Sequence, residues 1–269
     1  MTKQSIYWGA FPSRFISMVK TSLSFLLSKL GYKIERTGLA RFAKDMDSGF
    51  RSIWKDCASY TMTSIERTYG LYKTVEYVVN AKIPGVFVET GVWRGGSVMA
   101  AALSFQRFGD TSREFYLYDT FEGMSEPSLR DAMIGNNYPA KRLWETFRNR
   151  REQERWMCYA SLEEVRKSVL STSYPENKFT FVKGKVEDTL PGVMPEEISI
   201  LRIDTDWYNS TYHALKHLFP LLSSGGVLIL DDYGHWRGAR EAADQYFEEE
   251  KVSIFLNRID GAGRIGIKM

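Results

Sequence analysis

The chain is poor in cysteine and histidine. Its 269 residues include only two cysteines, Cys57 and Cys158, and three histidines. The cysteines form no CxxC pair and no HExxH segment is present, so the sequence predicts neither a disulfide framework nor a zinc site. Few and unpaired cysteines are typical of a reducing compartment, and we therefore expect a cytoplasmic protein.

The chain also lacks a strong excess of positive or negative charge. The 36 basic and 33 acidic residues leave a formal net charge of +3. This balance argues against nucleic acid as a partner, because a domain that binds nucleic acid usually carries a strong basic excess. Repeats and low-complexity tracts are absent from the sequence as well, and a hydrophobic content of 43% is enough for a large buried core.

No apolar run in the sequence is long enough to span a bilayer. The most apolar stretch, residues 15–30, carries Lys20 and Lys29 and lacks the cleavage pattern of a secretory signal. We expect a helix there that packs on its own protein or on a second subunit. Contact with a membrane surface through this helix is the alternative.

Residues 1–82 have the pattern of helices, and we expect them to form an N-terminal cap. Apolar side chains between Tyr69 and Val79 recur with a period of about 3.6 residues until Ile83-Pro84-Gly85 ends the pattern. In residues 83–269, short apolar runs alternate with helical patterns, which is typical of a doubly wound α/β domain with a parallel sheet. The predicted parallel strands are residues 86–88, 115–118, 179–182, 198–203 and 227–230.

Two features lie outside this regular alternation. Apolar runs at residues 252–256 and 264–268 flank an Asp260-Gly261 pair and predict a C-terminal hairpin. The segment of about residues 120–178 is too long for a simple crossover between strands. We therefore expect it to form an insertion on the ligand side of the sheet.

A glycine-rich turn follows the first predicted strand. It runs Glu89-Thr90-Gly91-Val92-Trp93-Arg94-Gly95-Gly96-Ser97 and leads into a predicted helix. Glycines let the backbone approach a ligand closely, and the start of the helix offers free N–H groups. The spacing is not the GxGxxG of dinucleotide folds, and an acidic Glu89 would repel a pyrophosphate but could hold a cationic amino group. The candidate ligand contacts are Glu89, Thr90, Gly91, Gly95 and Ser97.

A carboxylate ends the second predicted strand. Asp119 stands where Rossmann-type folds place a carboxylate that accepts hydrogen bonds from ribose hydroxyls. Together with Glu89, it predicts an adenosine ligand with an amino acid tail. Taken alone, each segment is equally consistent with an ordinary turn between strand and helix.

Four carboxylates follow the last two predicted parallel strands. Asp204 and Asp206 come after residues 198–203, and Asp231 and Asp232 come after residues 227–230. Ligands of open α/β sheets bind at this carboxyl edge, and clustered carboxylates repel one another unless a cation lies between them. An all-oxygen set suits Mg²⁺, Mn²⁺ or Ca²⁺ better than zinc. Such a cation would hold and activate a substrate hydroxyl, with one carboxylate, or His235, left as a base.

These segments in combination resemble the macrocin O-methyltransferase family, which are metal-dependent sugar O-methyltransferases. The resemblance covers roughly residues 60–250 and rests on four segments. They are Val88–Gly96, Tyr118–Gly123, Asp204–Thr211 and Asp231–Trp236.

The resemblance implies a fold, two cofactors and a set of roles. It implies a class I Rossmann-like methyltransferase sheet of five parallel strands with a C-terminal hairpin, and S-adenosylmethionine as the methyl donor. Further implications are that Glu89 and Asp119 contact the donor, that Asp206 is the general base, and that Mg²⁺ is bound by Asp204, Asp231 and Asp232. The acceptor would be a small hydroxylated molecule, commonly a glycoside. Assembly would be a homo-oligomer formed through N-terminal helices.

Two other functions stay open at this point. Asp204-Thr205-Asp206 has the DxD form with which metal-dependent glycosyltransferases bind a nucleotide sugar. Such an enzyme has no need of Glu89 beside a glycine turn. A protein that kept the fold and lost the chemistry is the third possibility, although the intact acidic residues argue against it.

Overall fold

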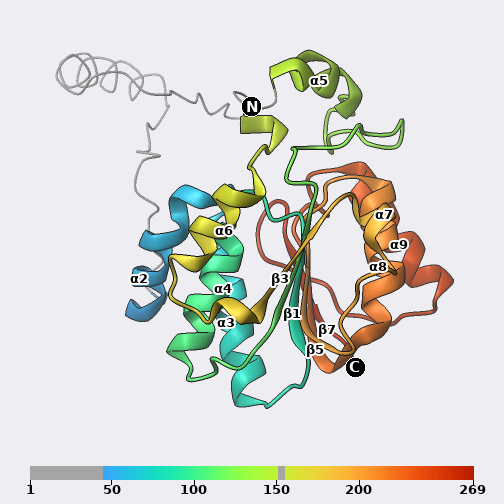
Figure 1. Ribbon diagram of the computed structural model, residues 1–269. Coiled ribbons are helices and arrows are strands. Elements are labelled where there is room, and N and C mark those ends of the chain that lie inside the picture. The colour runs from blue at the N-terminus through green and yellow to red at the C-terminus, as the bar shows by residue number, and fades with distance from the viewer. Residues whose placement is uncertain (1–44, 151–154) are drawn as a thin grey trace, which may run out of the picture. The chain divides into compact units, whose positions relative to one another are not determined.

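The computed structural model describes residues 45–150 and 155–269 (Figure 1). The predicted helix within residues 15–30 lies outside this range, so its packing and membrane contact stay predictions. The division at residues 82 and 83 into a cap and a sheet domain likewise stays a prediction. In the described ranges, no helix combines the length and the apolar character needed to cross a bilayer.

The described strands form one mixed sheet in the order β3-β2-β1-β4-β5-β7-β6. Strands β1 to β5 are parallel, whereas β7 pairs antiparallel with β5 and β6 pairs antiparallel with β7. The strand order reverses between β1 and β4, and open α/β sheets bind ligands at such a switch point. The strands are β1 (Val86–Thr90), β2 (Phe115–Asp119), β3 (Phe179–Lys183), β4 (Ile198–Ile203), β5 (Leu222–Leu230), β6 (Asn257–Arg258) and β7 (Arg264–Ile267).

Helices cover both faces of the sheet, as the predicted parallel strands require (Figure 1). One face carries α2 (Ser48–Cys57), α3 (Ile65–Asn80), α4 (Gly96–Arg107) and α6 (Leu162–Leu170). The other face carries α7 (Val186–Thr189), α8 (Tyr208–Leu218) and α9 (Arg237–Glu249). All six residues of β4 are buried between these layers. The class I methyltransferase sheet predicted from the sequence is confirmed.

The residue that caps helix α3, Ser64, also contacts the C-terminal hairpin. The Ser64 hydroxyl accepts a hydrogen bond from the Arg67 backbone N–H at 3.1 Å, which satisfies a free donor of the first turn. The same hydroxyl donates to Asp260 Oδ2 at 2.6 Å. The start of α3 is therefore anchored to the loop between β6 and β7, and this fixes the direction in which Arg67 extends.

The connection between β2 and β3 contains the predicted insertion. Its described residues hold α5 (Ala140–Phe147), α6 and three short 3₁₀ turns, of which Arg155–Met157 matters for the site. In Figure 1, α5 stands beyond the carboxyl ends of the strands. A bridge between Met133 and Trp236 ties this connection to the loop after β5.

One predicted strand is wrong. Residues 252–256 form no ladder, and β6 consists only of Asn257–Arg258. The segment does alternate, because Val252, Ile254 and Leu256 pack against the core while Phe255 is 83% exposed. Its backbone is held elsewhere, since the Val252 N–H donates to the Phe247 carbonyl at the end of α9. The pattern is that of an extended chain, but the strand pairing is missing.

Candidate active site

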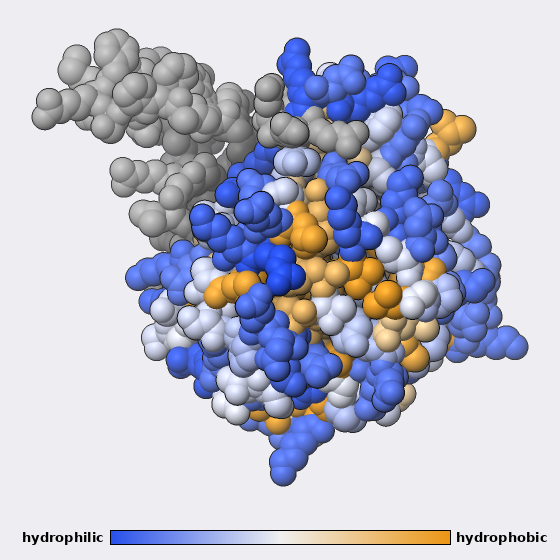
Figure 2. All heavy atoms as spheres, viewed as in Figure 1, coloured by the Kyte–Doolittle hydropathy of each residue, from blue (hydrophilic) through white to orange (hydrophobic). Residues whose placement is uncertain are grey.

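A cavity of about 380 Å³ lies at the carboxyl ends of the parallel strands. Its walls come from the loops after β1, β2, β4 and β5, from residues 60–63 before α3, and from the insertion. In Figure 2, apolar residues gather along the middle of the face in view, with hydrophilic residues on either side. Of the predicted site residues, the cavity is lined by Glu89, Gly91, Ser97, Asp119, Asp204, Asp206, Asp231 and Asp232. Thr90 and Gly95 are not among its lining residues, and their contact with a ligand stays a prediction.

Glu89 is buried at the floor of the cavity and pairs with Arg202 of β4. Burial raises the pKa of Glu89 to about 8, against the opposing charge of Arg202. Its second oxygen, Oε2, has no hydrogen-bond partner among the described residues. A buried acceptor without a partner that lines a cavity fits a ligand with a cationic or N–H group.

Gly91 brings the glycine turn against the acidic loop. Its φ is +83°, and a Cβ there would lie 1.9 Å from the backbone oxygen of Asp204. Only glycine fits both the left-handed backbone and this close approach. The turn after β1 and the loop after β4 are therefore in direct backbone contact.

Asp119 holds the glycine turn in place. Its Oδ2 accepts hydrogen bonds from the backbone N–H groups of Val92 and Trp93, at 2.7 and 2.9 Å. Its Oδ1 accepts from the N–H of Phe121 at 2.7 Å. Burial raises the pKa of Asp119, although these three N–H groups oppose the shift. The Thr120 hydroxyl also donates to Oδ1, at 3.4 Å, so all four lone pairs of the carboxylate face protein donors and a ribose hydroxyl would have to share one of them.

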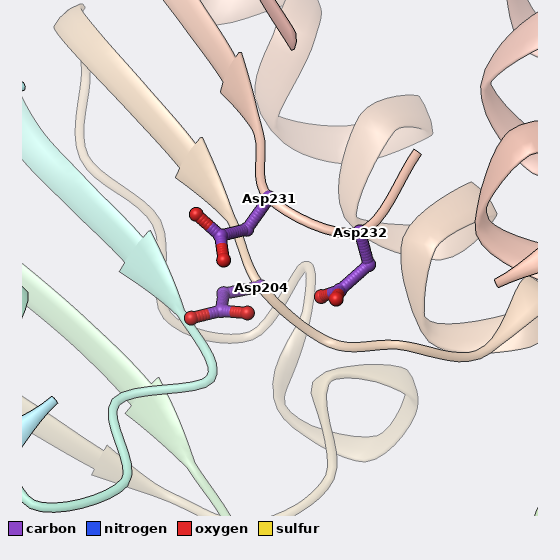
Figure 3. Close-up of side chains that lie close together, drawn as sticks. All are labelled: Asp204, Asp231 and Asp232. Carbon is purple, nitrogen blue, oxygen red and sulfur yellow. The ribbon is translucent and has the colours of Figure 1, made fainter. Parts of the chain in front are cut away.

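Three carboxylates converge at the ends of β4 and β5. Asp204, Asp231 and Asp232 each present one oxygen, and these oxygens all lie within 4.8 Å of one another (Figure 3). Burial and the neighbouring carboxylates raise the pKa of Asp232 well above its usual range. Asp232 Oδ2 is buried and has no hydrogen-bond partner among the described residues. An all-oxygen set with an orphaned acceptor fits a hard divalent cation.

Asp206 lies beside this triad in a strained backbone conformation. Its φ is +62°, which is uncommon for a residue other than glycine and marks many functional positions. Burial and the nearby Asp204 carboxylate raise the pKa of Asp206 to about 8. A carboxylate whose pKa lies near neutrality suits a general base.

Two arginines that the sequence reasoning missed organise the acidic residues. Arg202 is fully buried, and its guanidinium contacts Glu89, lies 2.8 Å from Asp204 Oδ2 and lies 2.6 Å from Asp231 Oδ1. The last contact is an ion pair without hydrogen-bond geometry, since Asp231 Oδ1 has no hydrogen-bond partner. The available signal for Arg202 was a charged residue inside the strand at 198–203, whose other residues are Ile, Leu and Ser199.

Arg67 approaches the triad from helix α3. It pairs with Asp231 Oδ2 through Nη1, and its Nε lies 3.0 Å from Asp260 Oδ2. Nothing in the local pattern of α3 marks Arg67, because its partners lie more than 160 residues away in the chain. Only the tertiary structure reveals this contact.

Comparison with known proteins decides between the open functions. The profile of the family described as macrocin-O-methyltransferase (TylF) matches residues 25–265. The chain belongs to this family. The family resemblance inferred from the four sequence segments is thereby confirmed, and the macrocin-type O-methyltransferase described here is an enzyme of the methyltransferase class.

Curated relatives of this methyltransferase include two from Streptomyces species. The 8-demethyl-8-(2,3-dimethoxy-alpha-L-rhamnosyl)-tetracenomycin-C 4'-O-methyltransferase of Streptomyces olivaceus is 33% identical over 210 residues, which are 78% of this chain and 76% of that protein. The demethyldecarbamoylnovobiocin O-methyltransferase of Streptomyces niveus is 30% identical over 205 residues, covering 76% and 74%.

Solved structures agree with this assignment. The O-methyltransferase NovP superimposes with a TM-score of 0.67 at 29% identity, covering 78% of this methyltransferase and 82% of that chain. A calicheamicin methyltransferase superimposes with a TM-score of 0.58 at 15% identity and covers 99% of both chains, which shows a shared fold. The glycosyltransferase and the noncatalytic alternatives are set aside.

Proposed function

We propose that this methyltransferase transfers the methyl group of S-adenosylmethionine to a hydroxyl of a glycoside, and that it requires Mg²⁺. The observation that carries the proposal is the convergence of Asp204, Asp231 and Asp232 in the same cavity as the glycine turn and Glu89. A donor site and a site for a hard cation within one cavity suit methylation of a hydroxyl, which is a poor nucleophile until its pKa is lowered.

The donor half of the cavity is formed by β1 and β2. Glu89 would accept a hydrogen bond from the amino group of the donor through its unpaired oxygen. Asp119 keeps the turn in a fixed shape and would accept from ribose hydroxyls. Ser97, in the first turn of α4, offers a hydroxyl on the same wall.

The cation half is formed by β4 and β5, where Asp204, Asp231 and Asp232 would hold Mg²⁺. Bound there, Mg²⁺ would lower the pKa of the acceptor hydroxyl, orient it, and offset the influence of Asp204 on the Asp206 carboxylate. Asp206 would take the hydroxyl proton. Arg67 and Arg202 hold the triad together by pairing with Asp231 from two sides.

The choice of a sugar hydroxyl rests on the relatives. The Streptomyces olivaceus enzyme is named for a position on a rhamnosyl tetracenomycin. A further relative from Micromonospora griseorubida, 29% identical over 205 residues, is named as the mycinamicin III 3''-O-methyltransferase. Acceptors of this kind are small hydroxylated molecules rather than macromolecules.

Calorimetric titration with S-adenosylhomocysteine tests the proposal. We expect saturable binding to the full-length protein, with Mg²⁺ binding lost on addition of a chelator and weakened in the Asp231→Ala variant. UDP-glucose serves as the competing ligand and is expected not to bind. Full methylation activity in chelator would eliminate the metal from the proposal, and binding of UDP-glucose alone would overturn the donor assignment.

The role of Asp206 gives a sharper prediction. Asp206→Asn removes the base and leaves the size of the side chain nearly unchanged. We expect the variant to bind S-adenosylhomocysteine and Mg²⁺ as the wild type does and to lose about 10²-fold or more in kcat. Asp188→Asn, on the exposed part of α7, is the matched control and should keep full activity. Normal turnover of Asp206→Asn would rule out Asp206 as the base.

A further inference from the structure

One wall of the cavity lies outside the proposed donor and cation sites. It includes Met124, Ser125 and Trp156 from the insertion, together with Trp207 and Trp236 from the loops after β4 and β5. The three indoles form a continuous series. The ring centroids of Trp156 and Trp207 lie 6.4 Å apart, and those of Trp207 and Trp236 lie 5.0 Å apart.

Two of these indoles are buried and contact other parts of the protein. Trp207 and Trp236 are each 3% exposed. The Trp207 indole N–H donates to the Ser125 carbonyl at 3.0 Å, and the Trp236 ring packs edge-on against the Trp207 ring. These two rings form the buried back of the wall.

Trp156 differs from both. Its side chain borders the cavity and is only partly buried, so its ring is accessible to a ligand. The Phe147 ring, 6.1 Å away, and the Trp207 ring support the indole from the protein side.

The backbone around Trp156 is fixed. The next residue, Met157, is fully buried, and its carbonyl accepts a hydrogen bond from the Met124 N–H at 2.8 Å. The Cys158 thiol also donates to the Trp156 carbonyl, at 3.5 Å. Trp156 therefore presents its ring from an anchored turn, and a preorganised surface of this kind binds a ligand at low entropic cost.

We propose that Trp156 is the platform on which the acceptor sugar ring stacks, so that the insertion selects the acceptor. This inference rests on the proposed function. The C–H groups on one face of a pyranose carry partial positive charge and complement the negative face of an indole. The same cavity is lined by the carboxylates of Asp204, Asp206 and Asp232. An indole and carboxylates within one cavity suit a ring that has an apolar face and hydroxyls on its edge.

Binding of methyl α-L-rhamnopyranoside tests the platform without requiring turnover. Saturation-transfer NMR is recorded on the full-length protein with S-adenosylhomocysteine and Mg²⁺. We expect contact to the ring C–H protons in the wild type, a dissociation constant about tenfold higher in Trp156→Ala, and a smaller increase in Trp156→Phe. Trp144→Ala is the matched control, because Trp144 lies in the same insertion but does not line the cavity. It should bind the sugar as the wild type does.

The sugar, S-adenosylhomocysteine and a planar aromatic probe together distinguish the platform from the proposed function. Equal binding of the sugar by Trp156→Ala and the wild type would overturn the platform, and so would the absence of sugar binding by a wild type that binds S-adenosylhomocysteine. If 7-hydroxycoumarin binds in a Trp156-dependent manner and the sugar does not, the wall holds an aromatic aglycone and the sugar proposal falls. Failure of the wild type to bind S-adenosylhomocysteine would instead count against the proposed function. Retained S-adenosylhomocysteine affinity in Trp156→Ala shows that the variant is folded.

Discussion

Arg202 carries a buried charge that is balanced by the carboxylates it contacts. Its guanidinium contacts Glu89 in the proposed donor half and Asp204 and Asp231 in the proposed cation half, and its Nη2 also donates to the Thr63 hydroxyl at 3.1 Å. Desolvating an arginine is costly, and desolvating the carboxylates without it would cost still more. The residue therefore holds both halves of the cavity in one charge-balanced unit.

Removing this charge should destabilise the fold. We expect Arg202→Met to lose about 3–5 kcal/mol in the free energy of unfolding, because it leaves buried carboxylates without a cation. The control is Arg166→Met, which breaks an ion pair with Glu176 whose side chains are 44% and 65% exposed, and it should lose less than about 1 kcal/mol. Urea denaturation measures both values. Similar losses in the two variants would show that Arg202 has no special role.

At the scale of single residues, the acidic side chains that line the cavity could be predicted from the sequence better than the arginines could. Asp204, Asp231 and Asp232 could be predicted to lie together because they follow apolar strands, and parallel strands end at one edge. Arg67 could not, since it lies on a helix whose orientation depends on Ser64 and Asp260. The bracing role of Asp119 also escaped prediction, because it depends on how the glycine turn folds back.

At the scale of elements, the contact between the β1 and β4 loops is the decisive one. Gly91 touches the backbone of Asp204, and the Asp204 N–H donates to the Thr90 carbonyl at 2.8 Å. The two loops flank the switch point of the sheet. A displacement of the donor loop therefore displaces an acidic ligand candidate as well.

Gly91→Ala should disrupt both halves of the cavity. The chain supplies a matched control in Gly109, which has the same φ of +83° but has nothing within 4 Å of its hypothetical Cβ. We expect Gly109→Ala to cost about 1–2 kcal/mol from backbone strain alone. Gly91→Ala should cost more and should also weaken S-adenosylhomocysteine binding, because of the clash with Asp204. Thermal unfolding and calorimetry check the pair, and equal behaviour of the two variants would contradict the steric explanation.

The bounds of a strand could be predicted from the sequence only where its residues are apolar. Residues 198–203 are predicted with the bounds of β4, whereas β5 begins at Leu222, well before the predicted start at Val227. The missed part contains Ser223 and Gly225, which interrupt the apolar pattern. The pairing with β4 is also irregular there: Ile198 pairs with Leu222, but Ile200 pairs with Val227. For residues 252–256 a strand was predicted where the structure has none, because apolar alternation does not by itself provide a neighbouring strand to pair with.

At the scale of the whole molecule, the cavity depends on distant parts of the described chain. Residues 60–63 form one of its walls, and Gly96 at the start of α4 passes so close to Tyr60 that a Cβ would lie 2.6 Å from the Tyr60 backbone. Arg67 joins α3 to the C-terminal hairpin and to Asp231. Among the described residues, none that precedes Tyr60 lines the cavity.

Deleting residues 1–30 should therefore separate assembly from ligand binding. We expect the truncated protein to bind S-adenosylhomocysteine with unchanged affinity, since most of the deleted segment also precedes the family match at residues 25–265. We further expect its mass in sedimentation to fall below that of the full-length protein, as assembly through N-terminal helices requires. Unchanged mass would contradict that mode of assembly. Equal partitioning of both proteins with lipid vesicles would exclude membrane contact through this segment.

The insertion between β2 and β3 has a consequence for how such enzymes diversify. The residues proposed to bind the donor and the cation lie at strand ends that Gly91 and Arg202 hold together, so we expect a substitution there to disturb both sites. Met124, Ser125 and Trp156 instead belong to the one connection between β2 and β3, which lies outside the ladder of the sheet. If this connection selects the acceptor as proposed, changes confined to one stretch of the gene would give a new acceptor and leave the methyl-transfer chemistry unchanged.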